Sequence, residues 1–199
     1  SLIDAVQLSR ADSHRYPHGD IAALSAQLKA STARRKLILT DAVFSMDGDL
    51  APLPALFELA EQHDAWLVID DAHGFGVLGK NGRGSLAHFQ IPFHKRLILM
   101  GTLGKAAGVA GAFVAADPVV IETLLQRARS YIFTTAASPI TAVTLVEAVH
   151  VISEADDRRA DLRALIQQLR TGLASLEGSR WQMLSSETAI QPIIIGDNT

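Results

Sequence analysis

Lys105 is the residue of this sequence that is best placed to act as a nucleophile. It lies in MGTLGKAAGVAGA (residues 100–112) and is the only charged residue between Arg96 and Asp117. An ammonium group in small, apolar surroundings is destabilised, so its amine becomes more available to attack an electrophile. Small neighbours also leave room for a bulky adduct. The pattern predicts a sheltered, reactive amine, and the competing interpretation is an ordinary loop lysine that reaches solvent.

Asp70 is a second candidate, because it ends the apolar run AWLVID (residues 65–70). Ligands of parallel sheets bind at the carboxyl ends of strands, where a partly desolvated carboxylate needs a cationic partner such as a protonated ring nitrogen. His73 places an imidazole shortly after it. Adjacent strand residues point to opposite faces, so Asp71 is expected to face away and support the following loop. We therefore expect no metal site here; the competing interpretation is a turn-capping aspartate beside a surface histidine.

Ser45 adds a hydroxyl beyond another apolar run, KLILT (residues 36–40), in the turn of TDAVFSMDGDLAPL (residues 40–53). Plain turn chemistry would also account for it. In neighbouring parallel strands, a hydroxyl, an acid with a nearby imidazole and an amine would meet at one edge of the sheet. A Schiff-base lysine with an aspartate at the pyridinium nitrogen is what a protein contributes to pyridoxal phosphate (PLP) chemistry. The combination favours a PLP site.

The glycine-rich stretch GFGVLGKNG (residues 74–82) matches two nucleotide-binding patterns incompletely. A P-loop needs Ser or Thr after its lysine and a helix beginning there, but Asn81 follows Lys80 and a helix-breaking turn follows. A dinucleotide fingerprint needs a helix within the motif and an acidic residue about 20 residues later, and HFQIPFHKR (residues 88–96) has none. A nucleotide-binding module stays the disfavoured hypothesis from a different class.

The composition is that of an ordinary globular protein, with 48% hydrophobic and 20% charged residues and a net charge of -3. This gives no electrostatic footprint for nucleic acid or membrane. The sequence has no cysteine, which excludes disulfides and zinc thiolates and fits a reducing compartment. With no apolar run of spanning length and no signal peptide, we expect a cytoplasmic protein. The chain lacks an initial Met and stops after PIIIGDNT (residues 192–199), which suggests a fragment.

Short apolar runs alternate with helical patterns along the chain, which is typical of an α/β fold. Four runs lack polar alternation, as strands buried on both faces do: residues 36–40, 65–70, 96–101 and 111–116. A helix between the first two makes a β-α-β crossover and implies parallel strands. Three further helices are predicted from the N-terminal caps Asp20, Asp117 with Pro118, and Ser138 with Pro139. A fourth is predicted from a stripe of leucines and ends at Gly178. A last strand is predicted at residues 190–195.

This order of elements predicts two domains joined by a helix. Residues 1–152 are expected to form part of a large α/β domain whose mostly parallel sheet lies between helices. Residues 153–177 are expected to form a connecting helix, and residues 178–199 the start of a smaller C-terminal α+β domain.

Three linked motifs make the sequence similar to a known family. TDAVFSMDGDLAPL (residues 40–53), VIDDAHGFGVLGKNGRG (residues 68–84) and GTLGKAAGVAG (residues 101–111) resemble, in order and spacing, the α-oxoamine synthases, which are fold-type-I PLP enzymes. The resemblance runs essentially end to end. It implies a large domain of the fold-type-I class and a homodimer with its active site at the subunit interface.

The resemblance also implies roles for individual residues. Lys105 matches the lysine that forms the Schiff base with PLP, Asp70 the aspartate that pairs with the pyridine nitrogen, and His73 the histidine near the phenolic oxygen; these are the expected catalytic residues. Asp41 stands where relatives often have Glu.

Further hydroxyls are implied to contact the cofactor. Ser45 and Thr102 match hydroxyls that contact PLP. Thr134 and Thr135 lie where the family places hydroxyls near the phosphate of the neighbouring subunit.

Within the family, EQHDAWLVIDDAHGFGVLG (residues 61–79) and AIQPIIIGDN (residues 189–198) are most similar to the members of biotin biosynthesis. The implied reaction condenses L-alanine with a pimeloyl thioester, pimeloyl-CoA or pimeloyl-ACP, and releases 8-amino-7-oxononanoate, CO2 and the free thiol carrier. A glycine-using member that makes 2-amino-3-ketobutyrate, another α-oxoamine synthase and a noncatalytic fragment stay open. The family places further site residues outside this chain, so residues 1–199 alone are expected to have little or no turnover.

Overall fold

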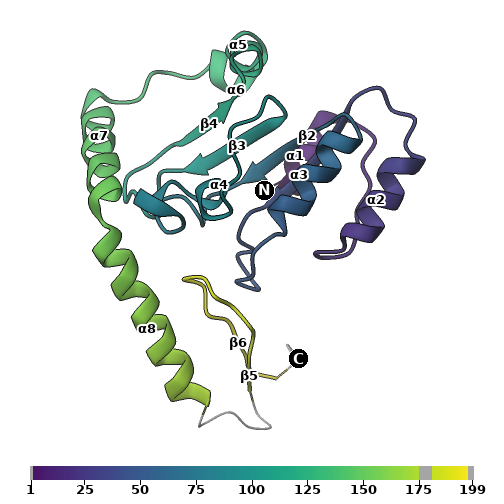
Figure 1. Ribbon diagram of the computed structural model, residues 1–199. Helices are drawn as coiled ribbons and strands as arrows, with labels where there is room; N and C mark the ends of the chain where they lie inside the picture. Colours follow the sequence, from purple (N-terminus) through teal and green to yellow (C-terminus); the bar gives the residue numbers. More distant parts are fainter. Residues whose placement is uncertain (1, 175–180, 197–199) are drawn as a thin grey trace.

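The computed structural model describes residues 2–174 and 181–196 and is built around a four-stranded sheet (Figure 1). Its strands are β1 (Lys36–Asp41), β2 (Ala65–Asp70), β3 (Leu97–Thr102) and β4 (Ala112–Ala116), in the spatial order β1-β2-β3-β4. The first three strands are parallel, as predicted, and β4 pairs antiparallel with β3. All four strands lie where the apolar runs predicted them.

Burial in the sheet alternates, which corrects the prediction that these strands are buried on both faces. Along β2, Ala65, Leu67 and Ile69 are fully buried, whereas the residues between them are only partly covered. Successive strand residues point to opposite faces, and only one face receives the apolar side of the covering helices. In the described chain β4 lies at one edge of the sheet, and its Val114 is 41% exposed.

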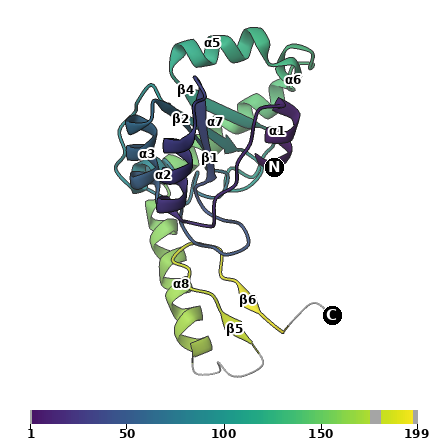
Figure 2. The ribbon, with the colours of Figure 1, turned by 90° about the vertical axis from the view of Figure 1, so that its right-hand side faces the viewer.

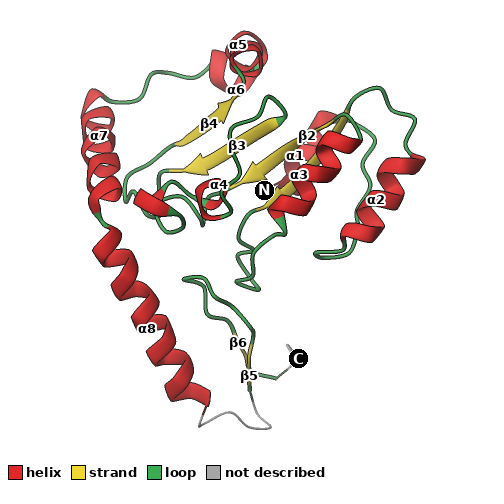
Figure 3. Ribbon diagram, in the orientation of Figure 1, coloured by secondary structure: helices red, strands yellow, loops and turns green. Residues whose placement is uncertain are grey.

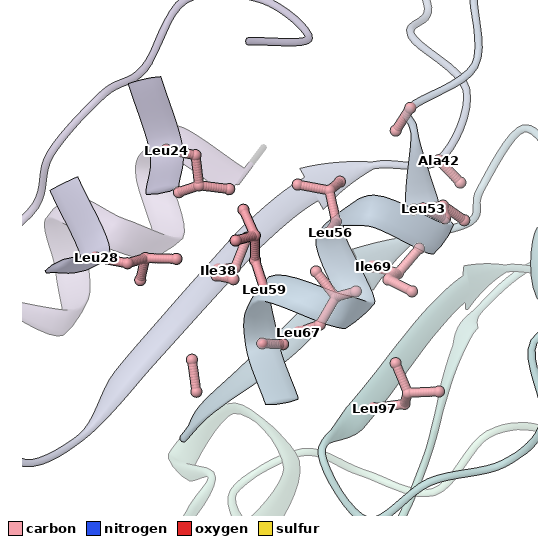
Figure 4. Close-up of a cluster of buried hydrophobic side chains, with 13 residues drawn as sticks. Leu24, Leu28, Ile38, Ala42, Leu53, Leu56, Leu59, Leu67, Ile69 and Leu97 are labelled. Carbon is pink, nitrogen blue, oxygen red and sulfur yellow. The ribbon is translucent and has the colours of Figure 1, made fainter. Parts of the chain in front are cut away.

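The main core lies between the sheet and two helices, α2 (Ile21–Ala30) and α3 (Leu53–Gln62) (Figure 4). From α3, Leu53, Leu56 and Leu59 reach the sheet at helical spacing, and Leu24 and Leu28 of α2 extend the cluster. Burying each leucine contributes roughly 2 kcal/mol. The N-terminus of α2 is capped as predicted, because the side chain of Asp20 accepts a hydrogen bond from the amide of Ala23 at 2.8 Å.

Four helices follow β4: α5 (Pro118–Arg127), α6 (Arg129–Ile132), α7 (Pro139–Glu154) and α8 (Asp156–Ala174). The two predicted caps are confirmed, since Asp117 accepts from the amide of Val119 at 3.0 Å and Ser138 from that of Ile140 at 3.3 Å. The predicted end of the last helix at Gly178 lies outside the described residues.

Several short elements were not predicted from the sequence: α1 (Leu2–Ser9), the 3-10 helix η1 (Lys80–Gly82), α4 (Ser85–His88) and β5 (Gln182–Met183). The strand predicted at residues 190–195 is shorter, because only β6 (Ile193–Ile194) pairs, antiparallel, with β5. Figure 3 shows that loops make up much of the chain around these elements. Within the described ranges, no helix combines the length and apolarity needed to cross a membrane.

Helix α8 extends away from the sheet, and the β5–β6 hairpin lies beside it in both views (Figures 1 and 2). The first turn of α8 is hydrogen-bonded to the loop after β2. Arg159 donates to the carbonyl of Gly76 at 3.1 Å, and Asp156 accepts from the amide of Asn81 at 3.1 Å. The described helices divide at Ala155. The division into residues 1–152, 153–177 and 178–199 stays a prediction.

Candidate active site

The carboxyl ends of β1, β2 and β3 bring the candidate residues of three separate segments together. The parallel register pairs Asp41 with Asp70 and Asp70 with Met100, so the last residues of β1 and β2 lie beside Met100, two residues before the end of β3. Asp70 ends β2 and is partly buried, and one of its oxygens accepts a hydrogen bond from the amide of Ala72 at 3.0 Å. This contact fixes the carboxylate at the edge where parallel sheets bind ligands.

Lys105 and His73 meet directly at this edge, with 2.8 Å between Nζ and Nε2. His73 is carried by the loop after β2 and Lys105 by the loop after β3. The second loop is closed by backbone hydrogen bonds from Leu103 to Gly111 and from Val109 to Leu103, both 2.9 Å. With the ring proton on Nδ1, Nε2 of His73 accepts a hydrogen bond from the lysine.

Four titratable groups of this edge influence one another. Burial lowers the pKa of His73, and the positive charge of Lys105 lowers it further, against the opposing pull of Asp70 and Asp41. Burial raises the pKa of Asp41, and the charge of Asp70 adds to this, whereas His73 and Lys105 oppose it. At neutral pH the imidazole is therefore neutral and available as an acceptor for Lys105.

Lys105 is exposed in the described chain, so the prediction of a sheltered amine is wrong for these residues. The glycines and alanines around it are too small to cover a four-carbon side chain. Its isolation from charge holds only along the sequence, because the carboxylate of Asp41 and the imidazole of His73 interact with it from other segments. The amine is open to a ligand and is surrounded by polar groups.

Asp71 turns away from Asp70, as predicted, and organises the glycine-rich loop. Its side chain is 1% exposed, and one oxygen accepts a hydrogen bond from the amide of Ser85 at 2.9 Å. A Cβ atom at Gly74 or Gly84 would collide with the two carboxylate oxygens. The glycines that imitate a nucleotide motif therefore leave room for this carboxylate. Burial raises the pKa of Asp71 to about 6, although the hydrogen bond from the amide of Ser85 opposes the rise.

The other predicted cofactor residues lie in different surroundings. Thr102 ends β3, and its hydroxyl is buried without a hydrogen-bond partner among the described residues. Ser45 is exposed in a turn that closes through a hydrogen bond from the amide of Gly48 to the carbonyl of Phe44, 2.8 Å long. Thr134 and Thr135 are exposed in the loop between α6 and α7. Neither lines the cavity described next, and their predicted role in a neighbouring subunit stays a prediction.

A cavity opens beside the Lys105–His73 pair. Its apolar walls come from the segments after β1 and β2, including Val43, Phe75 and Val77. Three more lining residues, Thr188, Ala189 and Ile190, come from the C-terminal part of the chain. Sequence reasoning assigned these three residues no role. The available signal was two hydroxyl residues, Ser186 and Thr188, shortly before Pro192, a pattern typical of a structured turn.

A possible cation-binding group lies elsewhere in the part of the chain that the structure describes. It consists of His18, Asp47 and Asp49, and His18 is hydrogen-bonded to Asp49 at 2.7 Å. Asp70, Asp71 and His73 form no such group within the described ranges, because Asp71 is turned into the loop.

Comparison with known proteins gives consistent similarities. The family model for aminotransferase class I and II matches residues 1–199. The chain is 65% identical to 8-amino-7-oxononanoate synthase of Herminiimonas arsenicoxydans and 61% identical to that of Dechloromonas aromatica (strain RCB), covering 100% of this chain and 51% of each relative. The chain thus spans about half the length of the curated relatives it matches.

Solved structures agree with the sequence comparison. A serine palmitoyltransferase from S. paucimobilis with a bound PLP-myriocin aldimine superposes with a TM-score of 0.87 at 25% identity, covering 100% of this chain and 50% of the other. An 8-amino-7-oxononanoate synthase from Francisella tularensis gives a TM-score of 0.75 at 32% identity, covering 92% and 55%. The predicted fold-type-I architecture and the resemblance to α-oxoamine synthases are confirmed.

The family match rests on the whole chain and not on one motif. Parallel strands, a carboxylate at the end of β2 and a lysine in the loop after β3 all lie in the matched region. Because the family model spans every residue from 1 to 199, the chain belongs to the aminotransferase class I and II family.

Proposed function

We propose that the protein is a PLP-dependent acyltransferase of biotin biosynthesis. In the proposed reaction, L-alanine and a pimeloyl thioester condense to 8-amino-7-oxononanoate, with release of CO2 and the free thiol carrier. The observation that carries the proposal is the contact between Lys105 and His73 beside Asp70, at the carboxyl ends of parallel strands. Relatives that are 56–65% identical over nearly all of this chain and are named 8-amino-7-oxononanoate synthase support it.

The residues present fit PLP. The hydroxyl of Thr102 is buried without a described partner, so a ligand group that hydrogen-bonds to it would remove the cost of burying it alone. Lys105 is exposed and can reach an aldehyde, and Asp70 offers a carboxylate to a protonated ring nitrogen. Lys105, Asp70, His73, Thr102 and Ser45 would hold the cofactor. Bound PLP supplies an electron sink that stabilises a carbanion formed beside the substrate amine.

The side chains of this chain would contribute positioning and proton transfer. The amine of Lys105 is proposed to remove the α-proton of L-alanine as a general base. Neutral His73, whose pKa is lowered by burial and by the nearby lysine, would hold that amine in place through the 2.8 Å hydrogen bond. Asp70, oriented by the amide of Ala72, would keep a ring nitrogen protonated by its negative charge.

We also propose a cytoplasmic homodimer whose active site lies at the subunit interface. Exposed apolar side chains gather on α6, α7 and the loop between them; among them Phe133 is 71% and Ile140 is 79% exposed. Apolar surfaces of this kind mark contacts with other chains or segments. Thr134 and Thr135 lie in the same loop, where a second subunit would bring them toward its cofactor. Light scattering of the full-length holoenzyme tests the dimer, and a monomer with full activity would contradict it.

Product identification tests the proposed reaction. Full-length protein is incubated with L-alanine or glycine and a panel of acyl thioesters on CoA and on acyl carrier protein, and the products are identified by mass spectrometry. We expect 8-amino-7-oxononanoate from alanine and a pimeloyl thioester. Formation of 2-amino-3-ketobutyrate from glycine as the preferred product would instead identify a different member of the family.

The Lys105→Ala variant tests the cofactor. The wild-type protein should show visible absorption from lysine-bound PLP, and the variant should lose both this band and turnover, with kcat falling by more than about 10³-fold. Lys80→Ala is the matched control, because Lys80 belongs to the glycine-rich stretch of the disfavoured nucleotide hypothesis. Binding of ATP that depends on Lys80, without a visible band, would overturn the proposed function.

A further inference from the structure

The loop Ser186–Gln191, called the 186–191 loop below, is docked onto the turn that follows β1. The side chains of Ser186 and Thr188 are only 5% and 4% exposed. Thr188 Oγ1 donates to the carbonyl of Gly48 at 2.8 Å. Ser186 Oγ lies 2.7 Å from the carbonyls of Gly48 and Ile190 and accepts from the amide of Thr188 at 3.1 Å. Two buried hydroxyls thus hold the loop on a single backbone carbonyl about 140 residues away in sequence.

Gly48 makes this close approach possible. Its φ angle is +74°, and an added Cβ would lie 2.6 Å from the carbonyl oxygen of Ile190 and 2.8 Å from Ser186 Oγ. A side chain at this position would therefore push the loop away as well as strain the turn. The packing indicates a defined position for the loop on this turn.

Gln191 ties the other end of the loop to α8. Its side-chain nitrogen Nε2 donates to the carbonyl of Thr188 at 2.6 Å, and its side-chain oxygen Oε1 accepts from Arg170 of α8 at 2.7 Å. The loop is therefore held both by the turn after β1 and by the long helix. Its residues cannot move from the cavity without breaking several of these hydrogen bonds.

The docked loop presents an apolar surface to the cavity that contains Lys105 and His73. Thr188, Ala189 and Ile190 line this cavity together with Val43 and other apolar residues. The hydroxyl of Thr188 is engaged by Gly48, so the methyl group of Ala189 and the side chain of Ile190 dominate this wall. The same cavity is lined by the hydrogen-bonded pair Lys105 and His73.

We propose that the 186–191 loop is the wall that selects the acyl chain of the thioester substrate, with Ala189 and Ile190 contacting its methylene groups. This assignment rests on the proposed function. The side chain of L-alanine is one methyl group and needs little apolar surface, whereas a pimeloyl chain carries a run of methylenes whose burial is favourable. An apolar wall that continues from the Lys105 amine into the C-terminal segment fits the longer group.

The test compares two substitutions on the same loop in the full-length holoenzyme. Ala189→Phe puts a bulky ring into the cavity, and Glu187→Phe is the matched control, because Glu187 is exposed and does not line the cavity. kcat/KM is measured with L-alanine and suberoyl-, pimeloyl-, butyryl- and acetyl-CoA, and on acyl carrier protein where that is the carrier used. Ala189→Phe should lower kcat/KM for the pimeloyl thioester by about 10-fold or more and change that for acetyl-CoA by less than about 3-fold. The KM for alanine and the visible PLP band should stay unchanged.

A second variant protects the test against simple misfolding. Ile190→Ala enlarges the cavity and should shift the acyl-chain preference toward chains longer than pimeloyl. Ala189→Phe should shift this preference in the opposite direction. Equal losses of kcat/KM for all chain lengths in both variants would overturn the assignment, as would an altered KM for alanine with acyl preference unchanged. If the wild-type protein converts none of the thioesters, the proposed function itself is wrong, which is a different outcome from unaltered chain-length preference in an active enzyme.

Discussion

The contact between His73 and Lys105 is the smallest unit from which chemistry can be argued in this protein. The lysine sits in a loop without other charges, yet in three dimensions it lies 2.8 Å from an imidazole and interacts with the carboxylate of Asp41. The histidine keeps its neutral form because burial and the lysine charge both disfavour protonation. The side chains at this edge therefore work as a coupled group.

His73 should determine the acid side of the pH profile. Burial and the nearby lysine lower the pKa of His73 below its usual value of 6.5. The imidazole therefore stays an acceptor for Lys105 until the pH falls below this lowered pKa, and protonation then removes the hydrogen bond. In His73→Ala, kcat should fall by about 10²-fold or more, and the acid limb attributable to this group should disappear. An unchanged acid limb of kcat/KM in the variant would contradict this role.

Asp71 should make the stability of the protein depend on pH. Burial raises its pKa from the usual 3.8 to about 6, so the folded state favours the protonated acid. The stabilisation is complete below about pH 4 and is lost as the pH rises through about 6; its upper limit is about 3 kcal/mol. Asp71→Asn should lack this slope when the free energy of unfolding is measured in urea between pH 4 and 8. Parallel curves for the two proteins would refute the assignment.

At the scale of elements, ends and turns carry more function than the regular strands and helices. Asp20, Asp117 and Ser138 cap their helices by side-chain hydrogen bonds, which is local chemistry. The turn after β1 is different, because the 186–191 loop from the far end of the chain docks on its Gly48. One turn therefore connects the strand that carries Asp41 with the wall of the cavity.

Gly48 and Gly19 form a matched pair that separates backbone strain from contact. Both have positive φ, +74° and +67°, but a Cβ at Gly19 meets no described atom within 4 Å. Gly19→Ala should cost about 1 kcal/mol of unfolding free energy from strain alone. Gly48→Ala should cost more than about 2 kcal/mol because the loop must also move. Urea denaturation measures both, and equal losses would show that the loop contact adds nothing.

At the scale of the whole molecule, the chain leaves much apolar surface uncovered. One sheet face packs against α2 and α3, while α7 exposes Ile140, Val143 and Val146, each more than 70% exposed. Lys105 is exposed as well. These surfaces fit a site that other segments or a second subunit complete, in keeping with a chain that covers about half of its relatives.

Residues 1–199 alone should therefore have little or no turnover. The chain spans about half the length of the curated relatives it matches, and a site that other segments complete can position its substrates only when those segments are present. Turnover of the isolated residues 1–199 is compared with that of the full-length protein by measuring product under saturating PLP. Normal turnover by residues 1–199 would refute this prediction.

The sequence by itself determined the four strands of the main sheet, the capped helices, the separation of Asp70 from Asp71 and the family. These follow from local periodicity, capping side chains and three linked motifs, all of which depend on residues close together in the chain. Only the tertiary structure decided the antiparallel pairing of β4, the exposure of Lys105 and the place of Ala189 and Ile190 beside it. These features depend on contacts between segments far apart in the sequence, such as Gly48 with Ser186. The spacing of residues along the chain does not show which distant segments meet in space.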